Sequence, residues 1–181
     1  MLGALSAALC EMAGNLTLGK KKYADVEPSI RLLIDKAETL RLRFLRLIDE
    51  DAAAFEPLSR AYAIPKSDPQ YRDKLREATL AACEAPMDMM RCTCRAVELL
   101  EEMMAKCSRL LVSDVGCGAA IAGAALDAAA LNVFVNTRLL PGELRARELE
   151  REAESMLLVY RARAQRLSDT VMNQLRGQDN G

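Results

Sequence analysis

An aspartate lies within an otherwise apolar helical stripe, and it is the residue of this sequence best suited to proton transfer. The stripe has spacings of four, three and four residues and consists of Phe44, Ile48, Asp51 and Phe55. Burial among apolar groups raises the pKa of a carboxyl group toward neutrality, where it can act as a general acid or base. We therefore predict that Asp51 is a buried catalytic group; the alternative is a structural carboxylate paired with an arginine or a helix N-terminus.

Four further polar residues flank a long run of small side chains. Ser113 and Asp114 precede this run, where they are most simply explained as a helix cap, although a helix N-terminus also attracts anions and polar groups. Asn132 and Asn136 are four residues apart at the other end of the run and share one helical face. Asparagines on an apolar helix need hydrogen-bond partners, which either the protein or a ligand can supply.

Three consecutive lysines, Lys20, Lys21 and Lys22, follow the first apolar segment. Such a run is explained equally by a solvated turn and by a site for a polyanionic tail. The whole chain has 25 basic and 26 acidic residues, for a net charge of −1. It lacks the basic excess expected of a nucleic-acid-binding protein, so we expect no nucleic-acid partner.

The sequence contains no histidine, which excludes several classes of site. Histidine general bases, Ser-His-Asp triads, histidine metal sites and the Glu-x-x-His pairs of di-metal bundles cannot form. Phosphate-binding loops of the GxxxxGK and GxGxxG types are also missing. We expect neither a metal site nor a tightly bound cofactor. The six cysteines form no CxxC pair, and we interpret them as reduced thiols in the cytoplasm, most of them small core residues.

Helical periodicity extends along nearly the whole chain. Hydrophobic residues make up 51% of the sequence but aromatic residues only 4%, a composition that favours helix over sheet. We predict an all-α bundle of about five to seven helices, with a central helix rich in small residues, as a single domain over residues 1–181. Asp68 is expected to cap a helix, and the tail from Gly177 is expected to be frayed. The expected helices are Leu2 to about Leu18, Pro28 to Tyr62 with a kink at Pro57, Tyr71 to Cys107 with a kink or break at Pro86, Ser113 to Asn136, and Glu143 to Leu175.

Two of these segments have notable apolar faces. The first helix carries one stripe of large residues that we expect to face the core: Leu2, Leu5, Leu9, Met12 and Leu16. The stretch Leu110 to Val135 is long enough to resemble a membrane span, but it contains Asp114, Asp127 and Asn132. We interpret it as a buried central helix, so we expect no membrane association; a small membrane-associated protein is the alternative.

Three sequence stretches resemble, in order and spacing, the motifs of the cyclodeaminase/cyclohydrolase family of folate enzymes. They are NLTLGKKKY (Asn15 to Tyr23), LIDEDAAAF (Leu47 to Phe55) and SDVGCGAAIAGAALDAAALNVFVN (Ser113 to Asn136). The segment around Pro86, with the preceding Ala-Cys-Glu-Ala, is also similar. The resemblance covers residues 2–154 and identifies the chain as a member of this family.

The resemblance implies an all-α, usually homodimeric cytoplasmic enzyme whose substrate is a tetrahydrofolate derivative. The first reaction it implies is that of a cyclodeaminase, which converts 5-formiminotetrahydrofolate to 5,10-methenyltetrahydrofolate and ammonia. The alternative is a cyclohydrolase, which hydrolyses 5,10-methenyltetrahydrofolate to 10-formyltetrahydrofolate. Both reactions can pass through a tetrahedral carbon bridging N5 and N10, so one site suits either. A formiminotransferase is a candidate partner.

The resemblance also assigns expected roles to residues. Asp51, with Asp114, is the expected catalytic group, and Asp51 protonates the leaving amine. Ser113, together with Asp114, is expected to orient the pterin or a water. The glutamate tail of the folate is expected to bind Lys20, Lys21 and Lys22. The remaining expected substrate-binding residues are Asn132 and Asn136. The resemblance implies a Gly-rich loop before the first helix, and because the sequence starts at Met1 within that helix, we expect either a truncated start or a member that has lost part of its site. A third function therefore stays open, that of a non-catalytic helical dimerisation module.

Overall fold

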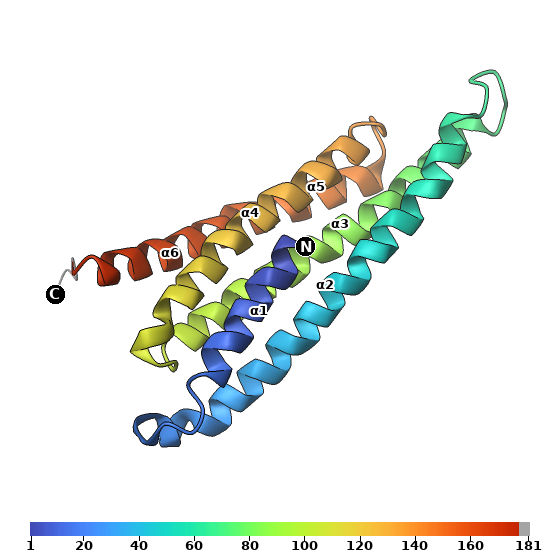
Figure 1. Ribbon diagram of the computed structural model, residues 1–181. Helices are drawn as coiled ribbons and strands as arrows, with labels where there is room; N and C mark the ends of the chain where they lie inside the picture. Colours follow the sequence, from blue (N-terminus) through green and yellow to red (C-terminus); the bar gives the residue numbers. More distant parts are fainter. Residues whose placement is uncertain (178–181) are drawn as a thin grey trace.

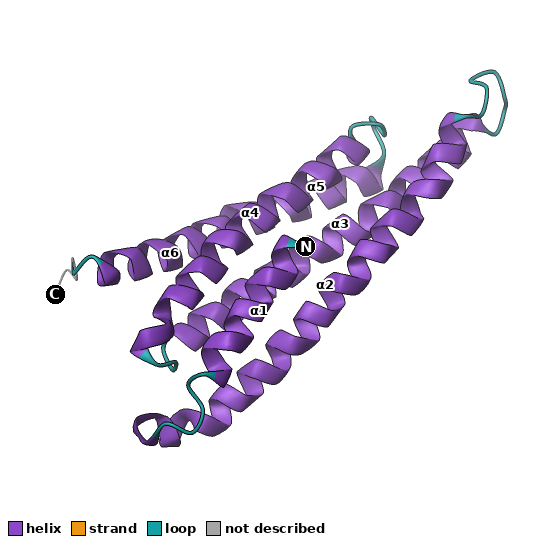
Figure 2. Cartoon of the chain, viewed as in Figure 1, coloured by secondary structure: helices purple, strands orange, loops and turns teal. Residues whose placement is uncertain are grey.

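The computed structural model describes residues 1–177, and it confirms the predicted all-α fold. The tail that we expect to be frayed lies outside the described residues from position 178 onward. Six α-helices and no strand are found within residues 1–177 (Figure 2). The helices are α1 (Leu2–Asn15), α2 (Glu27–Tyr62), α3 (Tyr71–Met104), α4 (Val112–Thr137), α5 (Leu144–Met156) and α6 (Ala162–Leu175).

Three short helical segments complete the described chain. They are the 3-10 segments η1 (Lys21–Val26) and η2 (Arg109–Leu111) and the π-helical segment η3 (Leu157–Arg161). Because η3 joins α5 directly to α6, the predicted last helix is continuous with a π-helical turn at its middle. Helices α2 and α3 are also uninterrupted although each contains a proline, Pro57 and Pro86 respectively. Pro86 therefore does not divide α3 into two helices.

The long helices α2 and α3 form an antiparallel hairpin on which the other helices pack (Figure 1). Helix α1 contacts α2, α3 and α4, while α4 contacts α1, α3, α5 and α6. The tip of the α2–α3 hairpin extends beyond the turn between α4 and α5 (Figure 1), while its base at Leu80 and Ala82 contacts α4 and α5. We call this tip, residues 55–82, the hairpin arm.

Helix α4 has the predicted central position, and its small residues explain why. A Cβ atom at Gly118 would lie 2.9 Å from Leu100 Cδ2, so any larger residue would displace the buried Leu100 side chain. The buried Ser6 hydroxyl of α1 donates a hydrogen bond to the Gly118 carbonyl at 2.9 Å. The helical stretch Arg109–Thr137 is long and apolar enough to span a membrane, with a mean hydropathy of 1.7 and 44% of its most apolar window buried. Its contacts with four helices confirm the predicted central position, but less than half of the window is buried, so the helix is buried on one side only.

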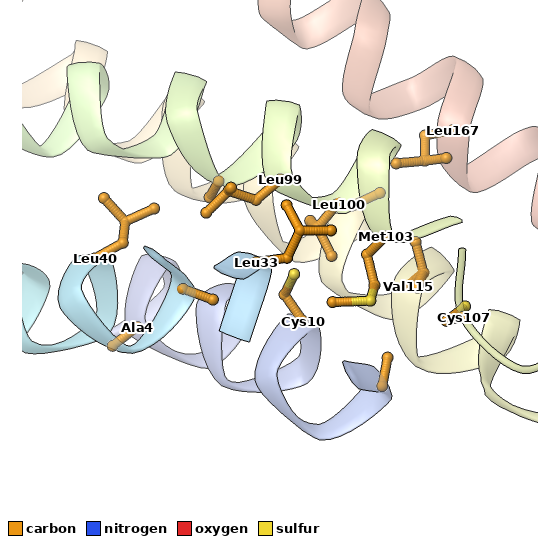
Figure 3. Close-up of a cluster of buried hydrophobic side chains, with 14 of the residues drawn as sticks. Ala4, Cys10, Leu33, Leu40, Leu99, Leu100, Met103, Cys107, Val115 and Leu167 are labelled. Atoms are coloured by element: carbon orange, nitrogen blue, oxygen red, sulfur yellow. The ribbon is translucent and has the colours of Figure 1, made fainter. Parts of the chain in front are cut away.

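The large residues of α1 point away from the core, so the predicted orientation of this helix is wrong. Leu2, Leu5, Met12 and Leu16 are 44%, 49%, 40% and 53% exposed. The buried face instead consists of small residues: Gly3, Ala4, Ser6, Ala7, Cys10, Ala13 and Gly14. Figure 3 shows Cys10 beside Leu33 and Met103, while Ala4 lies farther along the helix on the side of Leu40. The reason is the close approach of α1 to α2, because a Cβ at Gly3 would lie 2.3 Å from the Phe44 ring.

Both predicted helix caps are wrong by a few residues. Helix α3 begins after Gln70, whose backbone N–H donates to Asp68 Oδ1 at 2.8 Å, so Asp68 stabilises the preceding turn. Helix α4 begins before Ser113 and forms no side-chain cap bond. Ser113 and Asp114 lie within its first turn, where the negative charge of Asp114 still favours the helix dipole.

An ion-pair network connects α2, α3 and α5. The two Asp88 carboxylate oxygens accept hydrogen bonds from Arg43 and Arg91, each at 2.8 Å. Arg91 also binds Glu152 through two nitrogens, at 2.7 and 2.9 Å. Bidentate arginine–carboxylate geometry is the strong form of such contacts, so this network fixes the register of the three helices.

All six cysteines are free thiols, and most are small core residues as predicted. Burial raises the pKa of Cys10 to about 12 and that of Cys83 to about 11. Such thiols remain protonated at neutral pH and act as packing groups. The buried set is Cys10, Cys83, Cys94 and Cys107, whereas Cys92 is half-buried and Cys117 exposed.

Candidate active site

A cavity of about 320 Å³ between α2, α3 and the end of α4 contains three of the predicted site residues. We call it the Asp51 cavity. A second hollow of about 200 Å³ shares Asn132 with it and extends to the start of α1 and to Phe44. The cavity is lined by Asp51, Phe55, Leu58, Tyr62, Ala82, Pro86, Asn132, Val135, Asn136 and Leu139.

The cavity exists because α1 is much shorter than α2. Helix α1 begins beside Phe44, where Gly3 meets the aromatic ring, whereas α2 continues to Tyr62. The α2 stripe that begins at Phe44 is therefore covered by α1 at Phe44 but is no longer covered by it at Asp51 and Phe55. Asp51 is exposed and Phe55 is 63% exposed, so the prediction of a buried Asp51 is wrong.

Asp51 nevertheless has an environment unlike that of a surface carboxylate. Partial burial in the cavity raises the pKa of its carboxyl group above the usual value. Within residues 1–177, no basic group lies within 4.0 Å of it to form an ion pair. The alternative of an arginine-paired structural carboxylate therefore does not hold. An unpaired carboxyl with a raised pKa at a cavity wall is suited to transferring protons.

The two asparagines of α4 face the same cavity, as their spacing predicts. The Asn136 amide nitrogen donates to the backbone oxygen of Ala82 in α3 at 3.0 Å. The Asn132 amide nitrogen donates to the Ala128 oxygen of its own helix, also at 3.0 Å. These bonds orient both carboxamides, so their carbonyl oxygens are the groups that can accept hydrogen bonds from a ligand.

The other predicted site residues lie at the opposite end of the bundle. Asp114 is in the first turn of α4 and Asn132 is near its last, about 27 Å apart at a rise of about 1.5 Å per residue. The pKa of the Cys107 thiol is raised mainly by burial and is also influenced by the charges of Asp114 and Lys20. Lys20 and Asp114 therefore share one end of the bundle. Within one chain, Asp51 is not brought together with Asp114, Ser113 or Lys20 to Lys22.

The sequence pattern did not single out Tyr62, and it predicted Phe55 to be part of a buried apolar stripe. Both aromatic side chains line the cavity, and Tyr62 is 49% exposed. They are seven residues apart on α2, a spacing that places them on one helical face and that was readable from the sequence. Together with Val135 and Leu139 they form an apolar wall beside the polar groups, an arrangement typical of sites for flat organic ligands.

Comparison of the sequence with known protein families identifies the family of this chain. The family model described as Formiminotransferase-cyclodeaminase matches residues 1–155. The chain belongs to this family. The family predicted from the three sequence motifs is thereby confirmed, and the matched range contains every residue of the Asp51 cavity.

Relatives in the Formiminotransferase-cyclodeaminase family are named either as cyclohydrolases or as cyclodeaminases. The chain is 36% identical to a methenyltetrahydrofolate cyclohydrolase of Methylorubrum extorquens, over 96% of this chain and 85% of the relative. It is 26% identical to the formimidoyltransferase-cyclodeaminase of Rattus norvegicus, over 86% of this chain but only 30% of that longer protein. The names of the relatives thus fit both predicted folate reactions, and they support an enzyme of this kind.

A solved structure from the same family has the same fold. The formiminotetrahydrofolate cyclodeaminase of Thermotoga maritima superposes with a TM-score of 0.80 at 28% identity, covering 94% of this chain and 85% of that one. This similarity extends over nearly all of the described helices. It agrees with the all-α bundle that the sequence predicts.

Proposed function

We propose that the chain is a folate enzyme that hydrolyses 5,10-methenyltetrahydrofolate to 10-formyltetrahydrofolate in the Asp51 cavity. The observation that carries this proposal is the unpaired Asp51 carboxyl, with its raised pKa, facing Asn132 and Asn136 across one cavity. The choice of hydrolysis is supported by the 36% identity to a methenyltetrahydrofolate cyclohydrolase over almost the whole chain.

Asp51 would transfer one proton in each of two steps. In the first, its carboxylate accepts a proton from water as the water oxygen bonds to the methenyl carbon, giving a tetrahedral carbon that bears a hydroxyl group. In the second, the Asp51 acid returns this proton to N5 as the bond between carbon and N5 breaks. The hydroxyl proton goes to solvent, and the formyl group remains on N10. A carboxyl with a raised pKa is effective in both directions because its two protonation states are close in free energy.

The other cavity residues would orient the folate. The carbonyl oxygens of Asn132 and Asn136 can accept hydrogen bonds from pterin N–H groups. Phe55 and Tyr62 offer exposed aromatic surface, on which the flat pterin or the benzoyl ring can stack. This division into an apolar wall and a few polar groups fixes the one-carbon unit near Asp51.

Cyclodeamination of 5-formiminotetrahydrofolate is the second candidate, supported by the structural similarity to the Thermotoga maritima cyclodeaminase. N10 would then attack the formimino carbon, and the Asp51 acid would protonate the departing ammonia. A formiminotransferase would be the partner that supplies this substrate. Ammonia release with appearance of the methenyl chromophore marks this reaction, whereas loss of the chromophore without ammonia marks the hydrolysis.

The test of the catalytic proposal is Asp51→Asn, with Asp49→Asn as its control. Asp49 is an exposed carboxylate on the same helix that lines neither cavity. We expect Asp51→Asn to fold and to lose about 10²–10⁴-fold in kcat, and Asp49→Asn to keep wild-type turnover. Unchanged turnover of Asp51→Asn would refute the role of Asp51. A folded wild-type chain inactive in both assays would support the non-catalytic dimerisation module instead.

We further propose that the chain forms a homodimer through the exposed apolar face of α1 and α4. Large apolar side chains are exposed on both of these contacting helices, and exposed apolar patches mark candidate contact sites. Pairing of α4 with the α4 of a second copy, antiparallel about Ala124, would place Ser113 and Asp114 of one copy beside Asn136 of the other. The two separated halves of the predicted site would then meet. The face consists of Leu2, Leu5, Met12 and Leu16 of α1 with Cys117, Ala120, Ala124, Ala128, Leu131 and Val135 of α4.

Cysteine cross-linking tests this arrangement. Positions 117 and 131 are equally far from Ala124, so Leu131→Cys should react with the native Cys117 of the second copy through a short bismaleimide. Leu175→Cys on α6 is the control and should give no cross-linked dimer. A monomer by light scattering at micromolar concentration would refute the proposal.

In such a dimer the three lysines would lie near the Asp51 cavity of the other copy and hold the glutamate tail of the folate. Affinity for a polyglutamated folate should then fall as the salt concentration rises, because these lysines are exposed. Affinity that does not change with salt would remove Lys20 to Lys22 from the site.

A further inference from the structure

A groove of about 610 Å³ lies between α2 and α3 and shares no residue with the Asp51 cavity or the adjoining hollow. We call it the α2–α3 groove. Its buried apolar residues are Leu40 and Leu99, each 7% exposed. Its charged residues come from both helices, and apart from the adjacent Asp35 and Lys36 the successive ones on each helix are three, four or seven positions apart, which places them along helical stripes. None of the roles proposed for the folate reaction uses this groove.

Three cations of the groove have no acidic partner. Lys36 and Arg46 come from α2 and Arg95 from α3, and all three are exposed. In the part of the chain that the structure describes, none of them lies within 4.0 Å of a carboxylate. The fourth cation, Arg43, is already neutralised by its contacts with Asp88 and Glu50.

Most of the acidic groups in the groove are bound by residues outside it. Glu98 accepts a hydrogen bond from the Tyr160 hydroxyl at 2.6 Å and lies 3.7 Å from Arg163. Glu102 pairs with Lys106 at 3.6 Å. Asp35 is the remaining acidic residue of the lining. The lining as a whole carries four cations and three carboxylates, but among the groups that have no ion-pair partner within residues 1–177, three cations stand against Asp35 alone. These unpaired groups carry an excess of two positive charges, which matches a ligand with two negative charges.

We propose that the α2–α3 groove binds a small organic dianion, with acidic groups that contact Arg46 and Arg95 and a short apolar body that covers Leu40 and Leu99. Arginine is suited to this role because its planar fork binds carboxylate and phosphate groups through two parallel hydrogen bonds. A volume of about 610 Å³ lies in the range of small-molecule sites and exceeds the need of an inorganic anion. Dicarboxylates and phosphate monoesters share this chemistry.

The experiment measures binding of glutarate and of phenyl phosphate to the full chain by isothermal titration calorimetry. We expect the wild type to bind at least one of them, and the stronger of the two identifies the class of acidic group. Arg46→Gln with Arg95→Gln should weaken that binding about tenfold or more. The control is Arg72→Gln with Arg166→Gln, which removes the same charge from exposed positions outside the groove. This pair should bind as the wild type does.

Two results would overturn the proposal. One is a wild-type chain that binds neither probe at millimolar concentration. The other is equal weakening by the two double variants, because binding would then follow net charge and not the groove. Folate turnover should be the same in both variants, so a change in probe affinity is separable from any failure of the reaction proposed at Asp51.

Discussion

Two glycines of α4 face α6 and differ in the space beside them, which allows a matched test of this helix contact. A Cβ atom at Gly116 would lie 2.7 Å from Val171 Cγ1 and 2.9 Å from Val171 Cβ. At Gly123 the nearest atom would be the Ala164 Cβ at 3.8 Å, an ordinary van der Waals contact. We therefore expect Gly116→Ala and Gly123→Ala to have opposite effects on stability.

The magnitudes follow from two contributions. Replacing glycine by alanine inside a helix stabilises it by about 1 kcal/mol, and this contribution is common to both sites. At Gly116 the new methyl group overlaps a short β-branched side chain, so α6 must move, and overpacking of this kind costs about 1–3 kcal/mol. Gly123→Ala should gain about 1 kcal/mol, whereas Gly116→Ala should lose up to about 2 kcal/mol.

Urea unfolding followed by circular dichroism measures both free energies. The difference between the two variants isolates the overpacking contribution, because the helix-propensity contribution cancels. Val171→Ala provides the control, since it removes both methyl groups of Val171, keeps only the Cβ contact, and should make Gly116→Ala less destabilising in the double variant. If Gly116→Ala stabilises the chain as much as Gly123→Ala does, α6 does not pack on α4 in the way described.

Three further changes test other parts of the molecule. Thr17→Val removes the acceptor of the Ser108 N–H at 2.9 Å, so a buried donor loses its partner and urea unfolding should show a loss of about 1–3 kcal/mol. The exposed control Thr39→Val should change stability by less than about 0.5 kcal/mol, and equal losses would contradict the buried contact. Burial opposes a low pKa for Asp88, but hydrogen bonds from its two arginines lower it. Asp88→Asn should therefore unfold with a free energy about 1 kcal/mol lower than that of the wild type at pH values above ~3.9. This difference between the two proteins should disappear as the pH falls through the folded-state pKa of Asp88. A difference that persists in acid would refute the role of the two arginines. Because burial raises the pKa of Asp51, kcat/KM should fall with decreasing pH along a limb that begins above pH ~3.9, and an unchanged limb in Asp51→Asn would assign it to another group.

The periodicity of the sequence was enough to predict the helices but not which face of each helix is buried. For α1 the large residues were assigned to the core, whereas the structure buries the small ones. The amphipathic rule assumes that the apolar stripe faces the nearest core. It fails here because α1 lies so close to α2 that Gly3 touches Phe44, and this distance depends on tertiary packing.

The site was predicted in part for a related reason. The spacing of Asn132 and Asn136 correctly placed them on one face, and Asp51 was correctly associated with Phe55. The exposure of Asp51 could not be predicted, because it depends on how far α1 extends along α2. Nor does any sequence pattern show that Asp114 lies at the opposite end of the bundle, since helix length alone does not reveal which helix ends meet.

The local stability of the hairpin arm determines how rigid one wall of the Asp51 cavity is. Its own apolar cluster is small, consisting of Leu58, Ala61, Ala78 and Ala82 with the partly buried Leu75. A bidentate contact from Arg76 to Glu143 at 2.6 and 3.1 Å connects the arm to the start of α5, and at its base Ala82 accepts a hydrogen bond from Asn136 and Leu80 packs against α4 and α5. A segment with so few buried contacts opens at a lower free energy than the whole molecule, so its amides should exchange hydrogen earliest among the helices. Because Phe55, Leu58 and Tyr62 belong to the arm, one wall of the pocket is built on this locally unfolding unit, and ligand occupancy would slow exchange there more than in the rigid centre of the bundle.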